Sequence, residues 1–326
     1  MQINRSFFKT SWQILVGTYN GFMNDRVFKL SAALSYYTLF SIAPLLLIII
    51  SLAGRFYGEE ALQGKLFEEI NEFIGREAAL QVQEIIQNVT IKENSVLAVT
   101  TGIITLFIGA TGVFVEIQDS INMIWRVKAK PEKGWLKLLK NRLLSFSMIA
   151  TMGFLLIVSL IINGIVTAFS TKLHQYFPEV TVLLVQIFNS ALTFAIITIL
   201  LGIVFKFLPD VEIKWRDVRA GAIFTALLFM LGRYLITLYI ERVGPGSTYG
   251  AAGSLIVILV WVYYAAAILY FGAEFTQVYT EKHGRTIRPA SYAVHVTQIE
   301  EEREVKVLPD QNKENAGDES PSTPAS

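Results

Sequence analysis

Six long apolar stretches constrain this chain more than any other feature. A helix needs roughly 20 mostly apolar residues to cross the hydrocarbon core of a bilayer. Inside lipid each backbone N–H and C=O must find a partner within the spanning segment, so stretches of this length are helices. The sequence therefore predicts an all-α integral membrane protein with a six-span helical bundle at 31–280. The predicted spans are 32–53, 95–115, 143–168, 181–205, 220–240 and 251–275.

The charged residues outside these stretches predict the orientation of the bundle. Eighteen Lys and Arg residues lie in the segments of one side, against six on the other. Positive loops stay on the cytoplasmic side of a membrane. Both termini are therefore predicted to be cytoplasmic, and the basic loop 118–142 is suited to anionic lipid at that face.

Three further segments are predicted around the bundle. Residues 1–30 form an amphipathic cytoplasmic segment, either lying on the membrane surface or packed on the bundle. The extracytoplasmic loop 54–94 has apolar residues at helical spacing between its glutamates, which predicts short helices. The polar tail 289–326 lacks the apolar area to offset its ordering entropy, so it is predicted to be disordered.

Composition excludes several kinds of chemistry. Only 17% of the residues are charged and 53% are hydrophobic, which is typical of a membrane protein. The chain has no cysteine, so it has no disulfide, thiolate metal site or cysteine nucleophile. Its three histidines are dispersed, and no phosphate-binding loop occurs. We therefore expect no enzymatic activity, cofactor, metal or nucleic-acid partner.

Polar residues within or beside the spans are the candidate functional residues. Ionisable side chains in a membrane are costly unless paired or hydrated, and they often mark a functional site. Hydroxyl groups in a span either line a wet path or bridge neighbouring helices. The candidate polar pathway consists of Ser35, Tyr36, Thr38, Ser41, Asn122, Arg233 and Glu274.

Proline and glycine mark two candidate hinges. Pro44 lies inside the first span, where it frees a backbone carbonyl. A glycine-rich segment joins the last two spans and predicts a turn with close helix packing, or a helix start that is open to an anion. Its candidate hinge residues are Gly244, Pro245, Gly246 and Gly250.

Four strings, in order, resemble the YihY/BrkB family of bacterial inner-membrane proteins. They are AALSYYTLFSIAP at 32–44, QDSINMIW at 118–125, FLPD at 207–210 with Gly221-Ala222, and a last set of Tyr249-Gly250, Trp261 and GAE at 272–274. The resemblance implies a six-span protein of the bacterial plasma membrane. Members have carried the labels ribonuclease BN and serum-resistance virulence factor, and lipid-related transport has also been suggested.

Three function classes follow from these observations. A transporter for a lipid, amphiphile or other envelope substrate fits the polar span residues and the amphipathic segments. A non-transporting envelope scaffold or regulator fits the same sequence if those residues only hold helices together. A ribonuclease is disfavoured, because metal-dependent hydrolysis needs clustered histidine and carboxylate ligands, which this sequence lacks.

Overall fold

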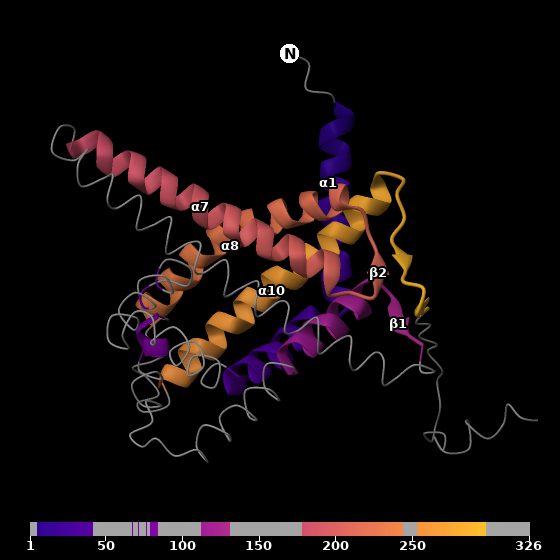
Figure 1. Cartoon of the computed structure of the whole chain (residues 1–326), viewed down its shortest axis with the longest axis horizontal. Helices are drawn as coiled ribbons and strands as arrows, with labels where there is room; N and C mark the ends of the chain where they lie inside the picture. Colours follow the sequence, from indigo (N-terminus) through magenta and orange to yellow (C-terminus); the bar gives the residue numbers. More distant parts are fainter. Residues whose placement is uncertain are drawn as a thin grey trace, which may run out of the picture. The chain divides into compact units, whose positions relative to one another are not determined.

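A computed structural model describes five segments of the chain and three single positions (Figure 1). These are residues 5–41, 79–83, 112–130, 178–243 and 253–297, together with single helical positions at 67, 71 and 76. The predicted third span, most of the first two, Pro44, the four hinge residues at 244–250 and the end of the tail lie outside the described residues. Within the predicted outer loop, residues 79–83 are helical.

Three of the described helices are long and apolar enough to cross a membrane. They are α7 (Pro178–Phe207), α8 (Trp215–Val243) and α10 (Gly253–Lys282). Each matches one of the last three predicted spans but runs longer, because helical hydrogen bonding continues into the polar residues beyond the hydrocarbon. The 30 residues of α10 extend about 45 Å, against a hydrocarbon core of roughly 30 Å.

The N-terminal helix α1 (Arg5–Asn24) packs along α10. It buries Ile14, Thr18 and Phe22, and its Gly17 lies against Val278 of α10. The opposite face exposes aromatic and aliphatic side chains. Of the two alternatives for this segment, the structure therefore shows a helix packed on the bundle, while contact of its exposed face with the membrane surface stays a prediction.

Two further helical stretches occupy residues 27–41 and 112–124. Arg26, with φ at 51°, separates α1 from the first, and Arg126, with φ at 56°, follows the second. This left-handed backbone conformation cannot continue a right-handed helix, so both turns redirect the chain. Phe22 and Phe28 on either side of the first turn meet edge to face, with ring centroids 5.0 Å apart.

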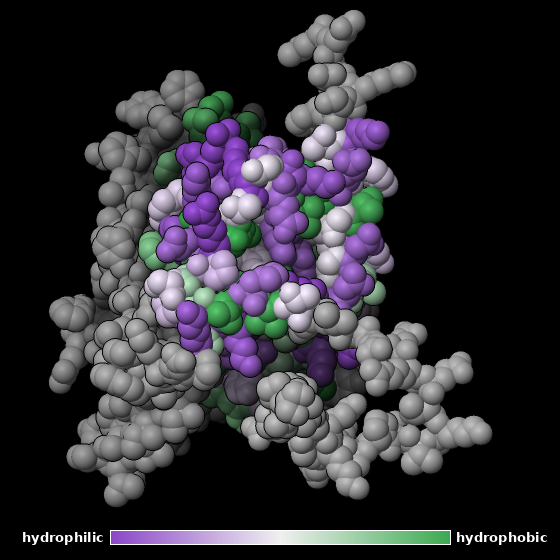
Figure 2. Space-filling model, turned by 90° about the vertical axis from the view of Figure 1, so that its right-hand side faces the viewer, coloured by the Kyte–Doolittle hydropathy of each residue, from purple (hydrophilic) through white to green (hydrophobic). Residues whose placement is uncertain are grey.

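Two small antiparallel sheets join the ends of these helices. Strand β1 (Val127–Ala129) pairs with β4 (Ala293–His295), and β2 (Val211–Glu212) pairs with β3 (Arg288–Pro289). The tail was predicted to be disordered from residue 289, but Pro289 and Ala293–His295 belong to these sheets, and residues 290–292 connect them. The polar composition of the tail did not predict these strands, because their pairing partners lie in loops that are distant in the sequence. Figure 2 shows hydrophilic side chains gathered on the face that includes the strands.

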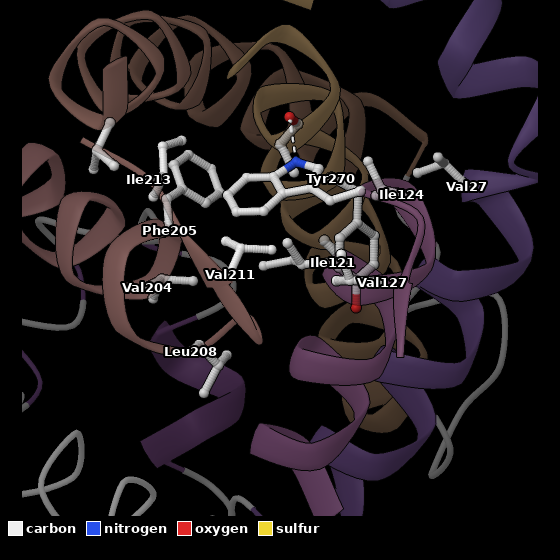
Figure 3. Packing of buried hydrophobic residues seen from close by; sticks show 14 of the residues in the cluster. Val27, Ile121, Ile124, Val127, Val204, Phe205, Leu208, Val211, Ile213 and Tyr270 are labelled. Atoms are coloured by element: carbon white, nitrogen blue, oxygen red, sulfur yellow. Dashed lines mark hydrogen bonds between the residues drawn. The ribbon is translucent and has the colours of Figure 1, made fainter. Parts of the chain in front are cut away.

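The main apolar core lies next to these sheets (Figure 3). Ile121 and Ile124 from the 112–124 helix meet Phe205 of α7 and Tyr270 of α10. All four side chains are buried. The core therefore holds the helix ends together next to the paired strands. It also fixes the positions of the polar side chains that follow each helix.

Candidate functional site

Asp210 is the centre of a buried hydrogen-bonded cluster at this polar end of the helices. Its carboxylate accepts hydrogen bonds from Gln118 Nε2 at 3.1 Å and Asn122 Nδ2 at 2.9 Å. Its backbone N–H donates to Asn122 Oδ1 at 2.8 Å, and Tyr292 also hydrogen-bonds the carboxylate. Only 1% of Asp210 is exposed. We call these four residues the Asp210 cluster.

Local sequence explains how the Asp210 cluster forms. Gln118 and Asn122 are four residues apart on one helix, so their side chains share a face. Pro209 follows the end of α7 and lacks the N–H that would continue a helix, which leaves Asp210 in the turn before β2. Burial and the neighbouring carboxylate of Asp210 raise the pKa of Tyr292, so its hydroxyl keeps the proton that it donates.

A second cluster places two carboxyl groups between α1 and α10. Arg126 Nη2 bonds Asp25 Oδ1 at 2.5 Å, and the carboxyl of Asp25 is within hydrogen-bonding reach of Glu274. Glu274 is 2% exposed, and its Oε1 has no hydrogen-bond partner. Trp125 fixes the adjacent backbone by donating from Nε1 to the Ala273 carbonyl at 3.0 Å. We call Asp25, Arg126 and Glu274 the carboxyl pair site.

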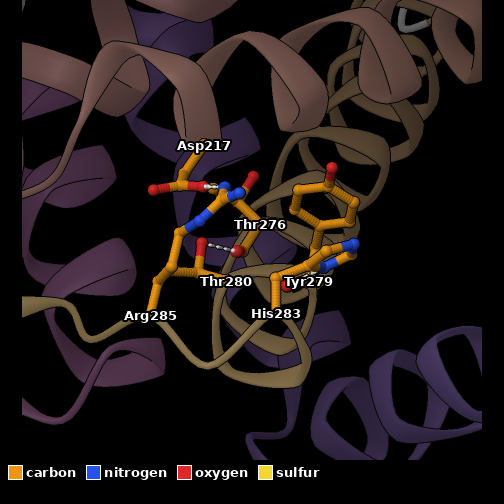
Figure 4. A network of polar contacts seen from close by, with 6 residues as sticks. All are labelled: Asp217, Thr276, Tyr279, Thr280, His283 and Arg285. Atoms are coloured by element: carbon orange, nitrogen blue, oxygen red, sulfur yellow. Dashed lines mark hydrogen bonds and ion pairs between the residues drawn. The ribbon is translucent and has the colours of Figure 1, made fainter.

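A buried ion pair ties the start of α8 to the segment after α10 (Figure 4). Asp217, in the first turn of α8, bonds Arg285. A carboxylate there also faces the positive end of the helix dipole. Beside this pair, the Tyr279 and His283 rings have centroids 4.2 Å apart. The pair holds the two helix ends together and contacts neither of the other two clusters in the interactions described.

An apolar groove runs along α8 and α10 in their membrane-spanning part, with a volume of about 280 Å³. Its lining residues are Phe22, Leu228, Leu231, Gly232, Leu235, Tyr264, Ala267, Ile268 and Phe271. Leu231 is 58% exposed, so one wall of the groove faces outward. Arg233 shares a narrow crevice with Tyr264 and Ile268, directly beside the groove. Among the residues that the structure describes, Arg233 has no carboxylate partner.

A comparison with protein families finds one match that covers most of the chain. A family model described as virulence factor BrkB matches residues 18–295. The chain belongs to the BrkB family. The match ends at the last residue of β4, so both sheets and all three clusters belong to the family region.

Several curated relatives of this BrkB-family chain are named UPF0761 membrane protein. One from Psychromonas ingrahamii is 28% identical over 84% of this chain and 89% of its own length. Relatives from Verminephrobacter eiseniae and Pseudomonas aeruginosa are 27% and 29% identical over 78% and 77% of this chain. The match spans 59% of the length of each of these two relatives. No solved structure is significantly similar to the chain.

In the structure, the serine and threonine hydroxyls of the predicted pathway hydrogen-bond to backbone carbonyls of their own helix. Ser35 Oγ donates to the Ala32 carbonyl at 2.8 Å, and Thr38 Oγ1 and Ser41 Oγ donate to carbonyls four residues earlier. Tyr36 is exposed on the same helix. Bonds of this kind satisfy a hydroxyl in lipid without a neighbouring helix or water. That these residues line a path in the BrkB-family protein stays a prediction.

Two other predicted pathway residues, Asn122 and Glu274, lie at the same end of the bundle, and a third, Arg233, lies elsewhere. Asn122 belongs to the Asp210 cluster, and Glu274 follows Ala273, whose carbonyl accepts a bond from Trp125 on the same chain segment as Asn122. Both therefore lie at the polar end of the bundle. Arg233 lies farther along α8, beside the groove. The predicted pathway residues that are described thus fall into separate places.

Sequence reasoning missed Asp25, Arg126 and Asp210 as site residues. Asp25 was assigned to the amphipathic segment 1–30, and Arg126 and Asp210 to polar loops, where a charge is usually solvated. A usable signal was present in the resemblance, since Gln118, Asn122 and Asp210 lie within two of the quoted family strings. Metal ligation is not indicated in the described part of the chain, where no three His, Asp or Glu side chains gather.

Proposed function

We propose that this BrkB-family protein is a plasma-membrane transporter for an anionic amphiphile, with both termini in the bacterial cytoplasm. One observation supports this function above others: an apolar groove along two membrane-capable helices lies beside Arg233, which has no carboxylate partner among the described residues. The groove suits an acyl chain, and the guanidinium suits a phosphate or carboxylate head group. The activity is not enzymatic, because no bond of the amphiphile is made or broken.

The cost of burying an arginine supports an anionic ligand at this position. A charged side chain within a bilayer is unfavourable unless it is paired, hydrated or extended to the interface. Arg233 sits among Phe229, Trp261 and Tyr264 rather than beside an acidic residue. Guanidinium binds phosphate and carboxylate in a planar, two-point geometry. An anionic head group would therefore supply the counter-charge that the described residues do not.

The outward wall of the groove supports a ligand that arrives from the bilayer. Leu231 and Leu235 line the groove, and each is half exposed or more. A lipid chain enters such a groove sideways and does not have to leave the hydrocarbon. Gly232 has no side chain, so Tyr264 can pack close to α8 at the base of the groove. A Cβ at this position would lie 2.9 Å from the Tyr264 ring.

The test is lipid movement in vesicles that contain the purified full chain. Fluorescent anionic and zwitterionic lipids are placed in both leaflets, and an impermeant reductant then quenches the outer leaflet. We expect the protein to accelerate exchange of the anionic probe over the zwitterionic one. Arg233→Gln should remove this preference, and Ala267→Phe, which fills the groove, should slow both probes.

Two matched variants control this experiment. Arg242→Gln removes a charge near the end of the same helix, and Leu227→Phe adds bulk to an exposed position that does not line the groove. Both should transport like the wild type. If the protein accelerates neither probe, transport of this class is excluded. The scaffold function would then be favoured, and a stable envelope partner should be recovered after mild solubilisation.

A further inference from the structure

The carboxyl pair site has an arrangement that neither transport nor packing explains. Glu274 brings an ionisable group to a place that is 2% exposed, and its Oε1 has no hydrogen-bond partner. Its other oxygen touches the backbone of α1, because a Cβ on Gly21 would collide with Oε2. An apolar residue would pack there at no electrostatic cost. The carboxyl therefore needs a ligand or a proton to account for it.

The geometry points to a proton as that ligand. Two ionised carboxylates within hydrogen-bonding reach repel each other, and such a pair normally shares one proton. Arg126 is already bonded to Oδ1 of Asp25, so the guanidinium compensates one negative charge only. We propose that Asp25 and Glu274 form a proton-binding site between α1 and α10, with Arg126 as its fixed counter-charge.

The surrounding groups favour a proton over a metal ion. The charged groups that act on Glu274 are Asp25 from the end of α1, Arg126 from the segment after the 112–124 helix, and Glu281 from α10 itself. In the described residues no third ligand completes a metal site, and Arg126 occupies the oxygen that a cation would use. From α8, this part of α10 meets Gly221, Phe224 and Thr225, none of which titrates.

Release of the proton has a mechanical consequence for α1. In the bound state one proton lies between the two carboxyl groups; release to water leaves two carboxylates. The new negative charge then faces Asp25 and the last turn of α1, whose unpaired carbonyls carry the negative end of the helix dipole. Among the described residues, Arg126 is the positive group that attracts it. Loss of the proton therefore pushes the C-terminal turn of α1 away from α10, and binding of the proton closes this contact.

The test measures the distance between α1 and α10 as a function of pH. The chain has no natural cysteine, so spin labels can be attached through Asn24→Cys, at the C-terminal end of α1, and Lys282→Cys, at the end of α10, both exposed positions. In the full chain in lipid nanodiscs, we expect a narrow distance distribution at acidic and neutral pH. At alkaline pH the distribution should broaden and shift to longer distances. Glu274→Gln should keep the narrow distribution throughout.

A control and a second readout make the outcome decisive. Glu212→Gln removes an exposed carboxylate in β2 that is not among the groups acting on Glu274, and it should titrate like the wild type. Infrared spectra at neutral pH should show a carboxylic-acid carbonyl band that Glu274→Gln removes. If that variant does not fold, Asp25→Asn should shift the same band. The inference fails if the wild-type distance is independent of pH and no such band is found, or if sodium or calcium closes the contact at constant pH. None of these results depends on the transported amphiphile.

Discussion

The α8–α10 contact and the Asp210 cluster hold the same bundle together by different means. The helices meet through two reciprocal pairs: Gly221 lies against Thr276, and Gly272 lies against Thr225. Each threonine hydroxyl bonds its own helix, at the carbonyl of Gly272 or Gly221, with both distances at 2.7 Å. Nothing polar crosses between the two helices in these pairs, and close approach of the backbones makes the contact.

The Asp210 cluster relies on bonds that do cross between elements. One carboxylate is shared by the 112–124 helix, the turn after α7 and the segment before β4. The difference reflects the surroundings. In lipid, apolar side chains gain little by leaving the hydrocarbon, so helices associate through close packing of small residues. At the polar end, water competes for each group, and a buried carboxylate selects one arrangement by its donors.

The largest effect is expected when the Asp210 cluster loses its acceptor. Asp210→Ala leaves the buried side-chain amides of Gln118 and Asn122 without their carboxylate acceptor, which should lower the free energy of unfolding by about 3 kcal/mol or more. Thermal unfolding of the protein in detergent measures the loss. Glu212→Gln, an exposed carboxylate two residues later, should unfold like the wild type. Equal stability of Asp210→Ala would show that the cluster is not structural.

A methyl group at the helix crossing should have the next largest effect. Gly221→Ala forces α8 away from Thr276, and overpacking of this kind costs about 1–3 kcal/mol. The matched control is Gly202→Ala in α7, where the new Cβ would be 3.9 Å from the Ala222 Cβ. Because alanine is the better helix former by about 1 kcal/mol, the control should be neutral or stabilising. The same response from both variants would contradict the close crossing.

The ion pair at the start of α8 tests an intermediate case. The side chain of Asp217 is 2% exposed and that of Arg285 is 24% exposed, so water screens one partner. A double-mutant cycle with Asp217→Asn and Arg285→Gln should give a coupling energy of about 1 kcal/mol that falls with added salt. Chemical unfolding at two salt concentrations measures it. A coupling that salt does not change would mean that the pair is more fully buried than its geometry shows.

The smallest effect is expected for the hydroxyls of the 27–41 helix. Thr38→Val removes a bond that stays within one helix, so stability should change by less than about 0.5 kcal/mol. Ser35→Ala should behave alike. A larger loss in either variant would indicate a bond to another helix or to water, and it would favour the predicted polar pathway over intrahelical bonding.

Apolar length and helical periodicity made the membrane helices predictable. The ends of α7, α8 and α10 lie within a few residues of the predicted spans, because about 20 apolar residues need no tertiary partner to form a helix in lipid. The helical pattern of α1 was also readable, but the structure buries Ile14, Thr18 and Phe22 and leaves apolar side chains such as Phe8 and Trp12 exposed. The same argument gives no information on which buried face meets which helix.

The partners of the polar groups came from the tertiary structure. Asp210 and Gln118 are separated by 92 positions, and Asp25 and Arg126 by 101, so no local pattern links them. Their pairing requires that the helix ends already be aligned by the apolar core and by the β1–β4 and β2–β3 strands. The helical state of a membrane-spanning segment is determined by the lipid around that one segment. The position of a buried charge is determined by the few partner atoms that several segments bring to it. For that reason the membrane helices follow from hydropathy, and the clusters at their ends follow only from the fold.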